Sequence, residues 1–225
     1  MNHIRSDTTS ATRFIIIRHG ETVWNVQGIK QGHLDSPLTS IGVRQSEAIA
    51  RRMSEEIFTH LYTSDLGRAH ETAKIIAART GHKILLDPNL RERNFGIFQG
   101  LTDKQVSERH SLEHARHEAD KVDYVIPEGE SLRHHHTRSI LCLEELAARH
   151  AGQSIAVVTH GGVIDSWFRF VFDIPLNHPR KAKLWNAGLN VIARETDGSW
   201  RLHTWGDQSH MQYVRALDDT VLVQS

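Results

Sequence analysis

The chain has little of several features that would define its class. Its 225 residues contain a single cysteine, Cys142, so an internal disulfide framework is excluded. Hydrophobic runs are also short. The polar segment 1–12 is followed by an apolar stretch that is far too brief for a signal-peptide core or a membrane span. We therefore expect a cytoplasmic protein with no membrane contact. Cys142 itself lies in an apolar helical pattern, which indicates a buried structural thiol.

Charge of one sign is also not in excess. The 27 Lys and Arg residues balance the 27 Asp and Glu residues, which gives a formal net charge of +0 at pH 7. No global basic field would attract nucleic acid or an anionic membrane. We expect neither as a partner, and any affinity for phosphate must come from a local site.

Several catalytic motifs are missing from the sequence. It contains no G-x-S-x-G, no H-E-x-x-H and no G-x-x-x-x-G-K-[ST]. This argues against a serine hydrolase of the α/β-hydrolase type, a zinc protease of the zincin type and a P-loop enzyme.

Strand and helix patterns alternate along the chain. Apolar runs predict strands at 14–17, 60–64, 82–88 and 154–159, and a terminal hairpin over 189–205 with Asp197-Gly198 as its turn. Helical spacing predicts helices over 38–56, 66–81, 130–152 and 163–172. Such alternation is typical of an α/β three-layer sandwich, with a mostly parallel central sheet and helices on both faces. We expect a polar tail at 1–12, one domain at 13–225, and a helical excursion over the pocket at 101–130.

Polar side chains follow the ends of four predicted strands. They are Arg18 and His19, Arg68, Glu92, and His160. Because the carboxyl ends of parallel strands meet at one edge of an open sheet, these groups should converge on one pocket. Two arginines offer planar donors that suit phosphate oxygens, and a glycine after each histidine would let backbone amides approach an anion. The pattern predicts a site for phosphoryl chemistry with a histidine nucleophile.

These residues resemble the histidine phosphatase superfamily, which includes the cofactor-dependent phosphoglycerate mutases. The resemblance rests on "RHGETVWN" at 18–25, "QGHLDSPLTSIG" at 31–42, "TSDLGRAHETA" at 63–73, "LRERNFGIFQG" at 90–100 and "VTHGG" at 158–162. It covers most of the chain and implies a phosphoglycerate mutase-like fold.

The resemblance also implies roles for individual residues. His19 would be the nucleophile that becomes phosphohistidine, and Glu92 would donate a proton to the leaving group. The phosphoryl oxygens would be held by Arg18, Arg68, His160 and Asn25. The substrate side of the pocket would be lined by Gln31, Gly32 and Gly161. No metal and no cofactor enter this chemistry.

Electrostatics support these roles independently. A histidine nucleophile must be neutral, and the flanking cations Arg18 and Arg68 should lower the pKa of His19 from its reference of about 6.5. The same cations oppose protonation of Glu92 in the empty pocket. A bound phosphate dianion reverses the local charge, so Glu92 should take up its proton as substrate arrives.

Two features point to different branches of the superfamily. "LRERNFGIFQG" resembles the mutases, whereas "PEGES" at 127–131 and the two glycines after His160 resemble the phosphatases. We predict a metal-independent phosphomonoesterase that acts on a small phosphorylated metabolite. The alternatives are a cofactor-dependent phosphoglycerate mutase and a non-catalytic member that binds phosphorylated ligands. Side chains in 101–130 are expected to determine the substrate.

Other clusters are weaker signals. His110, His114 and His117 lie on one helical face at metal-like spacing, but without the context of a known motif we interpret them as part of a solvated helix. Three consecutive histidines at 134–136 fan out around a helix and cannot converge on one ion. The aromatic residues of "WFRFVF" at 167–172 favour the core, with a homodimer interface as the alternative.

Overall fold

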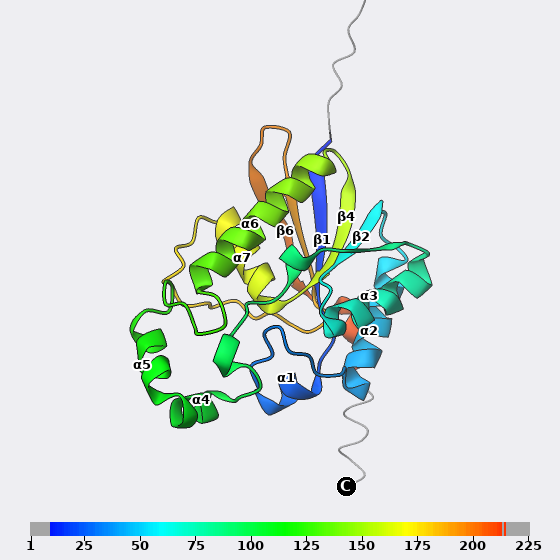
Figure 1. Cartoon of the computed structure of the whole chain (residues 1–225). Coiled ribbons are helices and arrows are strands. Elements are labelled where there is room, and N and C mark those ends of the chain that lie inside the picture. The colour runs from blue at the N-terminus through cyan, green and yellow to red at the C-terminus, as the bar shows by residue number, and fades with distance from the viewer. Residues whose placement is uncertain (1–9, 213, 215–225) are drawn as a thin grey trace, which may run out of the picture.

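The computed structural model describes residues 10–212 and 214, in which strands and helices alternate (Figure 1). The strands are β1 (Thr12–Arg18), β2 (His60–Thr63), β3 (Ile84–Leu86), β4 (Ser154–Thr159), β5 (Leu189–Arg194) and β6 (Trp200–Asp207). The helices are α1 (Val23–Gln27), α2 (Ser40–Met53), α3 (Gly67–Thr80), α4 (Asp103–Arg109), α5 (Ser111–Ala119), α6 (Leu132–Arg149) and α7 (Gly161–Val171). Short 3-10 turns occur at η1 (Pro88–Leu90), η2 (Gly96–Phe98) and η3 (Ser209–Met211).

Within the described residues the strands form one six-stranded sheet in the order β3-β2-β4-β1-β5-β6. The strands β3, β2, β4 and β1 run parallel, whereas β5 and β6 add an antiparallel edge. The terminal hairpin turns at Gly198, which has a φ of 83°. The mostly parallel sheet predicted from the sequence is thus confirmed. Its apolar runs reflect burial on both faces, as covered parallel strands require.

The two faces of the sheet carry separate cores. Ile15 and Ile17 of β1 pack with residues of α2 and α3, and Phe14 and Ile16 pack with residues of α6 and α7. Side chains alternate between the faces of a strand, so one strand supplies both cores. Figure 1 shows α6 and α7 on one side of the sheet and α2 and α3 on the other, which confirms the three-layer sandwich.

Local signals in the sequence set several boundaries. Helix α3 ends at Gly81, which adopts the left-handed conformation (φ 75°) that a C-terminal glycine cap requires. Helix α6 starts after Ser131, whose side chain accepts a hydrogen bond from the N–H of His134 at 3.0 Å. Cys142 is buried on α6, and burial raises the pKa of its thiol. The predicted burial of this thiol is confirmed.

Helices α4 and α5, in the segment 101–130, lie outside the three layers (Figure 1). They have a small core of their own that contains Phe98, Val106 and Ile126. His110 and His117 contact the ring of Phe98, with centroids 6.2 and 6.0 Å apart. Among the residues the structure describes, no group of three or more His, Cys, Asp or Glu side chains is placed to hold a metal ion.

The aromatic segment at 167–172 divides between core and surface. Trp167 is fully buried and meets Phe14 edge-on, whereas Phe172 is 49 % exposed, so the expectation of a core position is wrong for Phe172. None of the helices in the described part of the chain is both long enough and apolar enough to span a membrane.

Candidate active site

Two histidines meet at the carboxyl ends of β1 and β4. The two strands are parallel neighbours in which Arg18 pairs with Thr159, so the next residues, His19 and His160, leave the sheet side by side. Their ring centroids are 5.2 Å apart, and both side chains are buried. The convergence predicted from the strand ends is therefore present for this pair.

A hydrogen bond sets the tautomer of His19. Its Nδ1 lies 2.7 Å from the carbonyl oxygen of Gly20, and because a carbonyl only accepts, Nδ1 carries the proton. Nε2 is then left with a lone pair. Burial lowers the pKa of His19 far below its ordinary value, and Arg68 and Arg18 lower it further. The predicted direction is confirmed, with burial as a larger cause than either arginine.

Hydrogen bonds to carbonyl oxygens fix the guanidinium groups of Arg18 and Arg68. Arg18 donates from Nη1 to the carbonyl oxygen of Leu184 at 2.5 Å. Arg68 donates to the carbonyl oxygens of Gly32 and Leu34 at 2.8 and 2.9 Å and to Asp35 at 2.8 Å. Within the described chain, Nε of both arginines is buried without a hydrogen-bond partner. Burial lowers the pKa of Arg68, and it lowers the pKa of Arg18 to about 10, so the Arg18 guanidinium group stays charged at neutral pH.

His160 is fully buried, and neither ring nitrogen has a hydrogen-bond partner among the described residues. Burial, and then the charge of Arg68, lower the pKa of His160 far below its ordinary value. A neutral imidazole with free polar atoms beside two cations can bind an anionic oxygen through a ring N–H. The site can therefore bind a phosphoryl group.

Glu92 enters the site from the segment after η1. Its Oε1 accepts from the N–H of Arg93 at 2.8 Å, and its Oε2 accepts from the N–H of Gly162 at 3.0 Å. Burial on its own would raise the pKa of Glu92. The His135 ring, these two N–H groups and Arg68 outweigh it and hold the pKa below its ordinary value.

Two of the glycines that follow the histidines, Gly20 and Gly162, are required by close packing. The N–H of Gly20 donates to Thr72 Oγ1 at 3.0 Å, and a Cβ at Gly20 would lie 2.5 Å from the carbonyl oxygen of Gly42. A Cβ at Gly162 would lie 2.1 Å from Glu92 Oε1. The expectation that amides next to the histidines approach an anion is therefore wrong for Gly20. Of the two glycines after His160, Gly162 is explained by its contact with Glu92, whereas Gly161 has no contact closer than 3.7 Å and lines the cavity.

Asn25, predicted to hold a phosphoryl oxygen, and the predicted substrate-side residues Gln31 and Gly32 make hydrogen bonds within the protein. Asn25 Oδ1 accepts from the N–H of Thr22 at 3.1 Å and from Asn186 at 3.3 Å. Gln31 donates to Thr22 Oγ1 at 2.9 Å, and its own Oε1 is buried without a partner in the described structure. The carbonyl of Gly32 holds Arg68.

A cavity of about 310 Å³ opens beside Glu92 and Arg18. Among the described residues it is lined by Arg18, Glu92, Arg93, Phe95, Leu132, His135, Gly161, Gly162, Asp165, Arg180 and Leu184. Asn25, Gln31 and Gly32 are not part of this lining. Nor is any residue of 101–130, where the sequence had placed the determinants of substrate choice. The loop after α7 supplies Arg180 and Leu184 instead.

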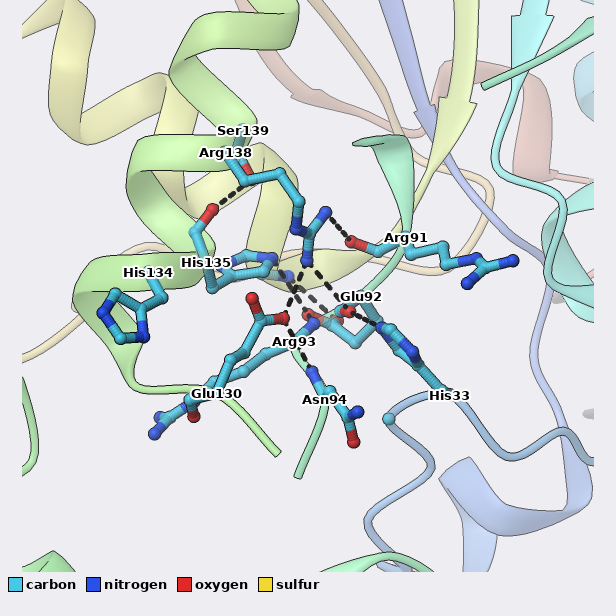
Figure 2. A network of polar contacts seen from close by, with 12 residues as sticks. His33, Arg91, Glu92, Arg93, Asn94, Glu130, His134, His135, Arg138 and Ser139 are labelled. Atoms are coloured by element: carbon cyan, nitrogen blue, oxygen red, sulfur yellow. Dashed lines mark hydrogen bonds and ion pairs between the residues drawn. The ribbon is translucent and has the colours of Figure 1, made fainter. Parts of the chain in front are cut away.

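Sequence reasoning missed several of these residues. Figure 2 shows the network around Glu92, in which the ring of His135 points toward Glu92 and His134 points away. His135 occupies the buried register of α6, in which Ser139, Cys142, Leu143 and Leu146 follow. That periodicity could have separated it from the exposed His134. Arg180 lies in the cationic stretch "HPRKAK" at 178–183, a visible signal.

Two buried histidines with two arginines beside them, at the carboxyl end of a mostly parallel sheet, define an α/β protein whose site suits a phosphate group. The family model of the histidine phosphatase superfamily (branch 1) matches residues 14–208, and the chain belongs to this superfamily of enzymes. Phosphoglycerate mutase-like protein 4 of Arabidopsis thaliana is 37 % identical over 211 residues, which cover 92 % of this chain and 90 % of that protein.

Two further proteins extend the comparison. Metal-independent phosphoserine phosphatase of Arabidopsis thaliana is 36 % identical over 212 residues, covering 93 % of this chain and 87 % of its own length. The solved structure of Bacillus stearothermophilus YhfR superposes with a TM-score of 0.82 and 29 % identity, covering 90 % of this chain and 100 % of that one. Fold and family thus agree with the resemblance seen in the sequence.

Proposed function

We propose that the protein is a metal-independent phosphomonoesterase that works through a phosphohistidine at His19. The observation that carries this proposal is the geometry of His19. The carbonyl of Gly20 holds the proton on Nδ1, so Nε2 is free to attack beside Arg18 and the buried Arg68. We propose Arg18, Arg68 and His160 as the groups that bind the phosphoryl oxygens, with Asn25 supporting them and Gln31, Gly32 and Gly161 shaping the substrate side.

In the first step Nε2 of His19 attacks phosphorus and the bond between phosphorus and the ester oxygen breaks. Glu92 donates its proton to that oxygen, and the alcohol leaves. In the second step water attacks the phosphohistidine, Glu92 takes a proton from the water, and the N–P bond breaks to release inorganic phosphate. Glu92 is ionised in the empty site, and the dianionic ester is what favours its protonation.

Two observations support a phosphatase over a phosphoglycerate mutase. The cavity beside Glu92 is lined by Arg18, the segment 92–95, α6, α7 and the loop after α7, and helices α4 and α5 contribute none of its described lining. A mutase must exclude water while its intermediate is re-transferred, which calls for a covered pocket. The relative named as a metal-independent phosphoserine phosphatase also favours this branch. The relative named as phosphoglycerate mutase-like keeps the mutase as the second candidate.

A rapid-quench experiment tests the phosphohistidine. Brief reaction with a ³²P-labelled phosphate ester should label the protein with an adduct that is labile in acid and stable in base. The adduct should be absent from His19→Ala. A labelled adduct that survives in this variant would show that His19 is not the nucleophile. A non-catalytic phosphate-binding protein would give no adduct at all.

A direct comparison of products separates phosphatase from mutase. Release of inorganic phosphate from a panel that includes phosphoserine should exceed interconversion of 3- and 2-phosphoglycerate, even with a bisphosphoglycerate primer. Primed interconversion about a hundredfold faster than phosphate release, equivalent to about 2.7 kcal/mol in barrier height, would assign the mutase function. Treatment with a chelator should not change phosphatase activity.

We also propose a cytoplasmic location, supported by the single cysteine, which leaves no partner for an internal disulfide. The proposed partner is a small phosphorylated substrate. No nucleic acid or membrane partner is proposed, and association into a homodimer stays a prediction.

A further inference from the structure

His135 is a buried polar side chain that the proposed chemistry does not use. Its exposed fraction is 0 %, and within the described residues neither Nδ1 nor Nε2 has a hydrogen-bond partner. Leaving a buried polar group unsatisfied costs free energy, so such a group needs an explanation. The ring also lines the cavity beside Glu92.

The ring faces one atom in particular. Nε2 of His135 lies 3.8 Å from Oε1 of Glu92, about 1 Å beyond hydrogen-bond distance. Both groups lie close to the backbone of α7, because a Cβ at Gly162 would lie 3.0 Å from His135 Cε1 and 2.1 Å from Glu92 Oε1. The imidazole from α6 and the carboxyl group of Glu92 therefore lie side by side next to the first turn of α7, and Figure 2 shows the His135 ring directed toward Glu92.

The carboxyl group of Glu92 has room for one more donor. The N–H of Arg93 reaches Oε1 and that of Gly162 reaches Oε2, which leaves further lone pairs on both oxygens. In the proposed cycle Glu92 becomes a carboxylate when the leaving group takes its proton. A third N–H donor to the carboxyl group, directed at Oε1, would stabilise that charge as it forms.

We propose that His135 is a positioning residue for Glu92, donating from Nε2 to Oε1 as the carboxylate forms and so making Glu92 a stronger acid. The inference rests on the proposed role of Glu92. Burial lowers the pKa of His135 to about 4, so the ring is a neutral donor at working pH. The other charged or titratable groups around the pair are Arg18, His33, Arg68, Arg93, Glu130, Arg138, His160 and Asp165.

Two substitutions distinguish positioning from simple packing. His135→Leu fills the space with an apolar group and removes the donor, whereas His135→Gln keeps an N–H donor. Positioning predicts that Leu lowers kcat for phosphoserine about tenfold or more, with KM changed less than about threefold, and that Gln restores most of the loss. A packing role predicts the reverse order of kcat, with His135→Leu more active than His135→Gln, because Leu is the better residue for a buried apolar position. That result would overturn the proposal.

The leaving group and pH provide a second readout. The loss in His135→Leu should shrink with nitrophenyl phosphate, whose leaving group needs no proton. The basic limb of the kcat profile should move up by about one pH unit, since removal of a donor to the charged form raises the pKa of Glu92. His134→Leu, on the exposed side of α6, is the matched control and should behave as wild type. An unmoved limb in His135→Leu would contradict the proposal.

A measurement on the unaltered chain applies even if His135→Leu does not fold. Nitrogen NMR of ¹⁵N-histidine-labelled protein with inorganic phosphate should show the His135 ring protonated at Nε2, with the assignment taken from His135→Gln. Protonation at Nδ1 alone would overturn the proposal. The role of Glu92 is tested separately by comparing kcat of wild type and Glu92→Gln on phosphoserine and on nitrophenyl phosphate. Equal losses on the two esters would show that Glu92 is not the acid and would remove the basis of the inference.

Discussion

At the scale of single residues, the site separates its titratable groups by what each one contacts. His19 and His160 are neutral because they are buried beside cations, and Glu92 is ionised because the His135 ring, two backbone N–H groups and Arg68 hold its pKa low. All three groups are thus deprotonated in the empty site, the histidines as neutral bases and Glu92 as a carboxylate that takes up its proton when the dianionic ester binds. Each state follows from a contact that a substitution can remove.

Glu92→Gln should abolish most turnover of alkyl phosphates while substrate binding is retained. The amide keeps the shape of the side chain but can neither donate the leaving-group proton nor activate water. We expect kcat for phosphoserine to fall by about 10² to 10⁴ and the loss to be much smaller for nitrophenyl phosphate. Steady-state kinetics on both esters measure this. Equal losses would mean that Glu92 is not the acid.

At the scale of elements, the first turn of α7 fixes the position of Glu92. The helix begins directly after His160, and its second residue, Gly162, gives Glu92 both an N–H donor and the space to lie against the helix backbone. The segment "PEGES" has a related role. Glu130 accepts from the N–H of Asn94 at 2.9 Å and pairs with Arg138 at 2.8 Å, so it ties the loop that carries Glu92 to α6.

Gly162→Ala should therefore be far more damaging than Gly161→Ala. The added methyl at 162 would overlap Glu92 Oε1 at 2.1 Å, whereas at 161 the nearest atoms, including Arg18 Nε, are 3.7 Å away. We expect kcat/KM for phosphoserine to fall about a hundredfold or more for Gly162→Ala and about tenfold at most for Gly161→Ala. A chemical denaturation curve for each variant separates this effect from loss of stability. Similar activity in the two variants would contradict the account of Glu92 given above.

How far the sequence predicts the structure depends on the kind of signal. The parallel strands and the residues at their carboxyl ends were predictable, because an apolar run and the residues that follow it are adjacent in the sequence. These patterns placed His19 and His160 correctly. Contacts between distant segments were not. The pairing of His135 with Glu92 and of Leu184 with Arg18 depends on how α6 and the loop after α7 pack, which no spacing encodes.

At the scale of the whole molecule, buried neutral histidines make the fold sensitive to acid. In the unfolded chain a histidine has a pKa of about 6.5, whereas burial lowers the pKa of His135 to about 4 in the folded protein. The unfolded state therefore binds more protons as pH falls below about 6.5, and folding stability decreases. His19 and His160 act in the same direction.

Urea unfolding at pH 7 and pH 5 should reveal this loss. His135 alone accounts for about 2 kcal/mol between the two values, since unfolded histidine is almost fully protonated at pH 5. His135→Leu should lose about 2 kcal/mol less than wild type over this range, and His134→Leu should lose as much as wild type. Equal pH dependence in wild type and His135→Leu would mean that the buried ring takes up its proton without unfolding.

The pairing of β1 with β4 has a consequence for the protein during its synthesis. The nucleophile is made near the start of the chain, but the strand beside it, at Ser154–Thr159, and the histidine after that strand are made much later. A nascent chain that has been synthesised only to the end of α6 lacks β4, so one edge of β1 has no neighbouring strand, and it also lacks His160. The ester-cleaving centre therefore appears late in translation, and until then the apolar edge of β1 needs protection from other chains.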